Sequence, residues 1–225
     1  FRDRLLKYTI GQPPSSGLNY RKWIDEGYTV IIKAPESLGR LTVRTIMSLH
    51  VLNFWRAALT RDDSPSKERM PFMIVADEPQ TWLSKNEQVL DDIFSKARKY
   101  GLGIMCLFQS FEQIAKESRT LLRIILDNAP DFFAFNTSNV QLNIRPYNAE
   151  KIPKYHYVAR IGGSEPIFCK APKMAKIIRG ENELEELIEK QKELFNCPWN
   201  EIEEELIRRE EQCEDLSLLG KRATF

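Results

Sequence analysis

The sequence predicts an α/β domain with a mostly parallel β-sheet, followed by a helical extension. Apolar segments of strand length alternate with amphipathic segments of roughly 10–20 residues, which is the pattern of successive β–α units. The segments Met70–Ala76 and Gly103–Phe108 are continuously apolar, as in strands that a parallel sheet buries on both faces. After Gly180 the composition changes, so we expect two parts, residues 1–180 and residues 181–225.

The first third of the chain predicts a short helix, a strand and a long helix. Leu18–Glu26 is expected to be helical and to stop before Gly27. Tyr28–Ala34 is rich in β-branched residues and is expected to be a strand. Apolar residues then recur with helical spacing from Leu41 to Leu59, which predicts a helix of about five turns. Arg61–Arg69 is polar and predicts an exposed loop.

The middle of the chain repeats the alternation of helix and strand. Ser84 and Glu87 have the spacing of a capping box, which begins a helix that Gly101 terminates. The apolar segment that ends at Phe108 is the next strand. A helix at Leu121–Leu126 and a strand at Asp131–Phe135 are expected to follow.

The last third predicts a β-hairpin and then a helical hairpin. Tyr155–Ile161 and Pro166–Lys170 flank the turn residues Gly162 and Gly163. Two apolar stripes with helical spacing follow. We expect them to dock residues 181–225 as helices on the body of the chain or on the next subunit. The alternative is a flexible, partly helical tail. The stripes are Leu184, Leu187 and Ile188, and Ile202, Leu206 and Ile207.

Charge divides the chain in the same place as composition does. Residues 181–225 contain 14 acidic and 6 basic residues, a net charge of −8, and since the whole chain carries +1, the remainder carries +9. A basic body suits a phosphate-rich partner such as DNA. The alternative is that these lysines and arginines only solvate the surface. The acidic tail would repel DNA, so any contact with nucleic acid is expected on the body.

Composition excludes several classes of protein. A chain of 225 residues with 42% hydrophobic residues can bury a core without disulfides or zinc. No apolar run approaches the roughly 20 residues of a membrane helix. The four cysteines form no CxxC pair and only two histidines are present, which disfavours a structural zinc site. The sequence therefore predicts a reduced, cytoplasmic chain.

Two adjacent carboxylates are the strongest candidates for chemistry. Asp77 and Glu78 directly follow the apolar run Phe72–Ala76, at the C-terminal end of a predicted strand. Ligands of open α/β sheets bind at this edge. Carboxylates placed there suit Mg²⁺ binding and the activation of water. The alternative is a strand that simply ends in an acidic turn.

Gln109 and Arg98 are two further candidates. Gln109 also follows a predicted strand, where its amide is positioned to contact a phosphate or orient water, or else to cap the next turn. Arg98 lies at the end of the preceding helix, where it suits an arginine finger acting on a neighbouring subunit, or else a cation that complements the helix dipole. Each signal is weak alone, and their order along the chain is what makes them informative.

In that order the segments resemble the HerA/FtsK superfamily of P-loop ATPases, most closely the TraG/TraD-type conjugative coupling proteins and HerA-like DNA translocases. The resemblance covers roughly residues 1–172. It rests on GYTVIIKAPESLG, RMPFMIVADEPQTWL, ARKYGLGIMCLFQSFEQI, ILDNAPDFFAFNTSN and IPKYHYVARIGGSEP.

The resemblance implies a RecA-like core and an ATP-driven DNA translocase. By position, Asp77 and Glu78 correspond to the Walker B pair, Gln109 to the sensor glutamine and Arg98 to the trans-acting arginine. ATP and Mg²⁺ are the implied cofactors, with Asp77 holding the metal through water. A homo-hexameric ring around DNA is implied, together with a membrane or secretion-channel partner reached through a segment N-terminal to this chain.

The sequence departs from the family in two respects. No GxxxxGK[ST] motif is present to cradle phosphates. Because the chain begins at Phe1 within a charged amphipathic stretch, we expect a C-terminal portion of a motor domain that is itself inactive. Pro79 also stands where an aromatic residue is more usual. The alternatives are a degenerate ATPase fold that serves as a binding module and, less well supported, a nuclease with clustered carboxylates.

Overall fold

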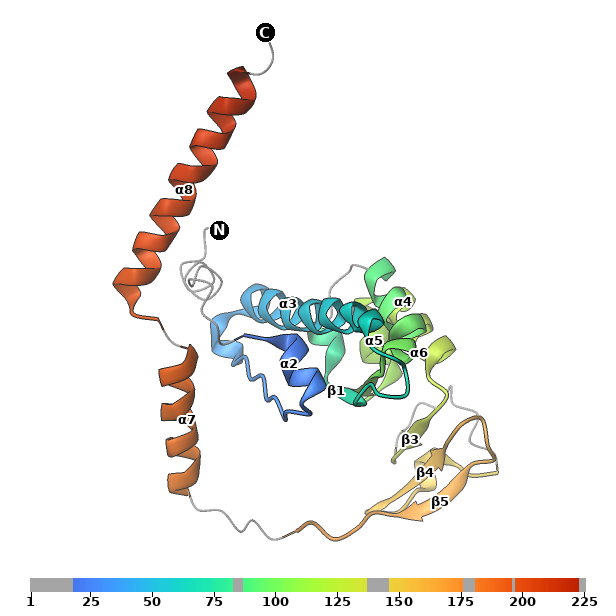
Figure 1. The fold of residues 1–225 in the computed structure, drawn as a ribbon. Coiled ribbons are helices and arrows are strands. Elements are labelled where there is room, and N and C mark those ends of the chain that lie inside the picture. The colour runs from blue at the N-terminus through green and yellow to red at the C-terminus, as the bar shows by residue number, and fades with distance from the viewer. Residues whose placement is uncertain (1–17, 83–86, 137–145, 176–180, 196, 223–225) are drawn as a thin grey trace. The chain divides into compact units, whose positions relative to one another are not determined.

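The computed structural model describes residues 18–82, 87–136, 146–175, 181–195 and 197–222. Residues 20–175 form one compact unit. The other unit contains, among its described residues, the two C-terminal helices. Figure 1 shows the elements in chain order. The capping box predicted at Ser84 falls partly outside the described residues.

A parallel pair of strands forms the centre of the first unit. β1 (Phe72–Asp77) pairs with β2 (Leu102–Leu107) in a register that places Phe72 opposite Leu102 and Asp77 opposite Leu107. The crossover between them contains α4 (Glu87–Lys96) and the 3₁₀ turn η4 (Ala97–Tyr100). Gly101 ends this turn with φ 72°, a conformation that favours glycine, as the sequence predicted. Both predicted strands are therefore present and parallel.

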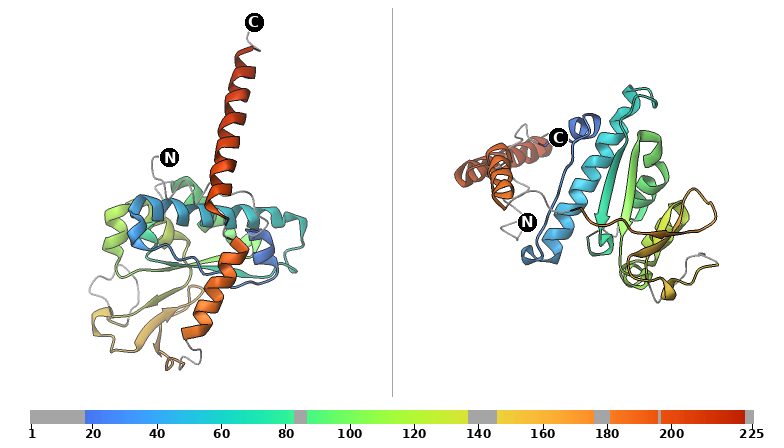
Figure 2. Two further views of the ribbon diagram at one scale, coloured as in Figure 1. Left: turned by 90° about the vertical axis from the view of Figure 1, so that its left-hand side faces the viewer. Right: turned by 90° about the horizontal axis from the view of Figure 1, so that it is seen from below.

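One face of this pair is covered and the other is not. The covered face packs against Phe54 and Trp55 of α3 (Arg40–Leu59) and against Ile93 of α4. Figure 2 shows α3 running beside the two parallel strands. The prediction that both faces are buried is wrong for these residues, because the outer face is exposed. That face consists of Met73, Val75, Met105 and Leu107, which are 54%, 58%, 39% and 44% exposed.

Two predictions for the first third of the chain are also wrong. Tyr28–Ala34 forms no strand, although Val30 and Ile32 pack partly buried against the core. The segment after α3 is not an exposed loop throughout, because it begins with the 3₁₀ turn η2 (Thr60–Asp63), in which Arg61 is fully buried. The preceding short helix, α2 (Tyr20–Asp25), lies within its predicted bounds.

The second sheet is antiparallel. α5 (Phe111–Glu117) and α6 (Arg119–Asn128) lead from β2 to β3 (Phe132–Ala134). β3 pairs with β4 (His156–Arg160), which pairs with β5 (Ile167–Lys170) as the predicted hairpin. The fold is thus mixed α/β, and the expected mostly parallel sheet is present only as the β1–β2 pair within the described chain.

Two helices follow in the second unit, α7 (Glu181–Phe195) and α8 (Trp199–Arg222). Leu184, Leu187 and Ile188 of the first stripe are exposed, so the docking of this stripe stays a prediction. Among the described residues, no helix combines the length and the apolar character needed to cross a bilayer.

Candidate functional site

The parallel register brings the predicted site residues to one edge of the sheet. Asp77 ends β1 opposite Leu107, which ends β2, so Glu78 and Gln109 follow neighbouring strand ends. The Glu78 amide continues the ladder by donating to the Leu107 carbonyl at 2.9 Å. This edge is the one at which open α/β sheets bind their ligands.

A hydrogen bond joins two of the predicted residues. The Gln109 side-chain amide Nε2 donates to Oε1 of Glu78 at 2.9 Å. Glu78 is half-buried, whereas Asp77 and Gln109 are exposed. No described residue donates a hydrogen bond or forms an ion pair with the Asp77 carboxylate. The edge therefore combines one carboxylate with a fixed orientation and a second carboxylate that is open to solvent.

Glu78 has an unusual backbone conformation. Its φ of 44° and ψ of 54° lie in the left-handed region, which costs an L-residue other than glycine about 1–2 kcal/mol. Pro79 disfavours the ordinary helical conformation for the residue before it. A strained residue of this kind persists only where its surroundings fix it, and such residues cluster at functional sites. The proline that departs from the family pattern therefore belongs to a defined turn.

Gln113 and Gln80, which lie close to the site residues along the chain, each have a buried amide oxygen, and sequence reasoning missed both. Gln113 of α5 donates from Nε2 to Oε1 of Gln109 at 3.4 Å, while its own Oε1 is buried without a hydrogen-bond partner among the described residues. Gln80 is 5% exposed, and its Oε1 also lacks a described partner. The spacing of Gln109 and Gln113 by four residues was a usable signal for the first amide. For Gln80 the sequence gives no such signal.

Arg98 lies at the other edge of the sheet. It is an exposed residue of η4, which precedes β2, whereas Glu78 and Gln109 follow the strands. Six residues of strand separate the two edges by about 20 Å. Arg98 is one of the residues that line an open depression of about 530 Å³. Its lining consists of Ser66, Ser95, Lys96, Arg98, Lys99 and Gly101.

The carboxylate pair fits the requirements of Mg²⁺. This ion keeps several waters and is usually held by one or two carboxylates together with substrate phosphates. Asp77 and Glu78 supply two such carboxylates, and the open carboxylate of Asp77 is accessible to a hydrated ion. Within the described ranges no group of three or more His, Cys, Asp or Glu side chains gathers into a cage for a metal. The donor set therefore matches Mg²⁺ with phosphate oxygens better than a metal held by protein alone.

Two other side chains of reactive types, Cys106 and His50, lie partly buried outside this site. Burial raises the pKa of the Cys106 thiol to about 12, so it stays protonated and is a poor nucleophile. Burial also lowers the pKa of His50, whose Nδ1 lies 2.8 Å from the Tyr20 hydroxyl. His50 is thus a hydrogen-bonded residue at the edge of the core.

Comparison of the chain with known protein families, with curated proteins and with solved structures found no match. The function of the chain is therefore inferred from the geometry of the strand-end site and from the residue pattern.

Proposed function

We propose that this chain supplies the water-activating part of an ATP-hydrolysing site in a DNA-translocating motor of the HerA/FtsK type. The observation that carries the proposal is the hydrogen bond between Gln109 and Glu78. It joins residues 31 positions apart that the resemblance assigns to one site, as Walker B glutamate and sensor glutamine. A RecA-like core is part of the same proposal.

Each side chain has a distinct role in this proposal. Asp77 binds Mg²⁺ through water, and the ion, when bound, neutralises charge on the phosphates of ATP. Glu78 accepts a proton from the attacking water. Gln109 holds the Glu78 carboxylate in one orientation and responds to the γ-phosphate from the adjacent strand end. No phosphate-cradling motif is present in the sequence, so these contacts must come from other residues, and the chain alone is expected to bind ATP weakly.

The position of Arg98 favours action between subunits. Because Arg98 and Glu78 lie at opposite edges of one sheet, the arginine is too distant to contact a nucleotide bound at its own strand-end site. Contact with a neighbour's nucleotide requires a head-to-tail interface, which closes into a ring when the rotation between subunits permits. The homo-hexamer implied by the resemblance satisfies this requirement. DNA would be held in the ring through its backbone by the basic body.

The decisive variant is Glu78→Gln in the natural protein, by which we mean the complete motor to which this proposal assigns the chain. It should still bind ATP but hydrolyse it about 10²- to 10⁴-fold more slowly, because general-base assistance is lost. Glu150→Gln makes the same change of charge at an exposed residue of the 3₁₀ turn η5 (Ala149–Lys151) and should hydrolyse ATP normally. Turnover of Glu78→Gln equal to wild type would remove the assignment. A wild-type protein that binds DNA or protein partners without hydrolysing ATP would favour the binding-module alternative.

A further inference from the structure

The strained conformation of Glu78 is fixed from both sides. The peptide unit before it is held at both ends, since the Trp82 indole Nε1 donates to the Asp77 carbonyl at 2.9 Å and the Glu78 amide donates to the Leu107 carbonyl at 2.9 Å. The peptide unit after it is held by Thr81, which donates to the Glu78 carbonyl from its hydroxyl at 2.8 Å and from its amide at 3.0 Å. Rotation about φ and ψ of Glu78 is therefore restrained by groups outside Glu78 itself.

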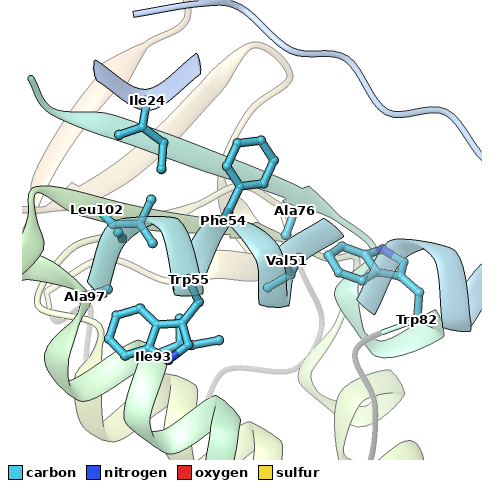
Figure 3. Packing of buried hydrophobic residues seen from close by; sticks show 10 residues of the cluster. Ile24, Val51, Phe54, Trp55, Ala76, Trp82, Ile93, Ala97 and Leu102 are labelled. Atoms are coloured by element: carbon cyan, nitrogen blue, oxygen red, sulfur yellow. The ribbon is translucent and has the colours of Figure 1, made fainter. Parts of the chain in front are cut away.

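Trp82 is anchored well enough to act in this way. It is 6% exposed and belongs to the core cluster that includes Val51 and Ala76. Figure 3 shows its ring at one end of this cluster, with Ala97 and Leu102 at the other. Its carbonyl accepts a hydrogen bond from the Ser48 hydroxyl of α3 at 2.9 Å. Through its carbonyl and its indole, Trp82 thus connects the long helix to the backbone of the carboxylate pair.

We infer that Trp82 and Thr81 are positioning residues that clamp Glu78 in its left-handed conformation and so direct its carboxylate to Gln109. The catalytic meaning of the clamp rests on the proposed function, whereas the clamp itself is a property of this chain. Without the clamp, Glu78 relaxes toward an extended conformation, which re-aims its side chain and breaks the hydrogen bond to Gln109.

Substitutions that each remove one donor test the clamp. Trp82→Phe keeps a buried aromatic ring but removes the indole N–H, and Thr81→Val keeps the shape but removes the hydroxyl. Trp55→Phe is the matched control, because Trp55 is 7% exposed in the same cluster and its indole nitrogen makes no hydrogen bond to another described residue. Thr81→Ser restores the hydroxyl and should behave as wild type. Thr81 is exposed, so its variants test the clamp even if Trp82→Phe folds poorly.

The first readout is the side-chain amide signal of Gln109 in ¹H–¹⁵N NMR spectra of the 225-residue chain, assigned by its loss in Gln109→Glu. Glu78→Ala gives the reference position for a Gln109 amide without its partner. Trp82→Phe and Thr81→Val should move the signal toward that reference, while Trp55→Phe and Thr81→Ser leave it in place. An unmoved signal in both clamp variants, or an equal movement in Trp55→Phe, overturns the inference.

The second readout is steady-state ATP hydrolysis by the natural protein. Misplacement of Glu78 should lower kcat by about 10- to 100-fold with KM unchanged, because binding of ATP does not need the base. Trp55→Phe should keep the wild-type kcat. A wild-type protein without ATPase activity contradicts the proposed function, and the NMR result then still decides whether the clamp exists. A moved Gln109 signal with unchanged kcat overturns the positioning role in catalysis.

Discussion

The two edges of the β1–β2 sheet both carry charged side chains, but these are bound in different ways. At the N-terminal edge, the guanidinium of Arg61 donates to the carbonyls of Tyr100 and Met70 at 2.9 and 2.8 Å and pairs with Asp25. Arg69 likewise donates to the Lys99 carbonyl at 2.8 Å. At the C-terminal edge, Asp77 is exposed, and no basic side chain among the described residues forms an ion pair with it.

The charged groups at the N-terminal edge stabilise the fold, whereas the carboxylate at the C-terminal edge is available to bind a ligand. A buried guanidinium that binds main-chain carbonyls just before two adjacent strands ties the starts of these strands together, and its burial keeps it from a ligand. The exposed carboxylate of Asp77, next to Glu78 with its strained backbone, contributes little to stability and can still bind a cation. Arg98 belongs to the second class although it lies at the first edge, because it is exposed and pairs with no described residue.

Arg98→Ala should therefore show the largest effect on activity and almost none on stability. A finger acting in trans is worth about 10³–10⁵ in turnover, whereas an exposed side chain without partners changes the free energy of unfolding by no more than about 0.5 kcal/mol. ATPase assays of the natural protein and thermal unfolding of the chain measure the two effects.

Mixing variant subunits tests whether Arg98 acts between subunits. Arg98→Ala subunits combined with Glu78→Gln subunits should partly recover hydrolysis, since some interfaces then pair an intact Glu78 with an intact Arg98. Normal ATPase activity of Arg98→Ala, or activity that does not depend on assembly, would contradict the assignment.

Arg61→Met should cause the largest loss of stability, about 3–5 kcal/mol. The substitution keeps much of the side-chain volume but removes the buried guanidinium, so that the Tyr100 and Met70 carbonyls and part of the charge of Asp25 lose their partner. Arg40→Met is the matched control, because Arg40 forms an exposed ion pair with Glu117 that is worth no more than about 1 kcal/mol. Urea unfolding of both variants gives the difference directly. Equal losses would mean that Arg61 is not a structural residue.

The contrast between the edges was only partly predictable from the sequence. The long periodic pattern of α3 and the continuous apolar runs of β1 and β2 predicted these elements, and parallel strands then place Glu78 and Gln109 at one edge. The burial of Arg61 was not predictable, because its segment is polar and nothing local shows which carbonyls a guanidinium will bind. The exposed outer face was missed because a continuous apolar run carries no information on which of its faces another element covers.

The smallest expected effect is the change in the free energy of unfolding caused by Glu78→Gly, and the sign of this change tests whether Glu78 is strained. Glycine adopts the left-handed region freely, so Glu78→Gly removes a cost of about 1–2 kcal/mol, while the greater freedom of glycine in the unfolded chain takes back about 0.5–1 kcal/mol. The exposed hydrogen bond to Gln109 is also lost, so we expect a net stabilisation of no more than about 1 kcal/mol.

Asp77→Gly, one residue earlier in the extended strand, should instead destabilise by about 0.5–1 kcal/mol, because there glycine has only its entropic cost. Tyr155→Gly should resemble Glu78→Gly, since Tyr155 is the other described non-glycine residue with positive φ, at 63°. Urea unfolding of the three variants tests the comparison at adjacent positions. A loss of stability in Glu78→Gly as large as that in Asp77→Gly would show that the left-handed turn is not strained. A gain would show that the chain keeps a glutamate where glycine is more stable, which is the signature of a side chain retained for its chemistry.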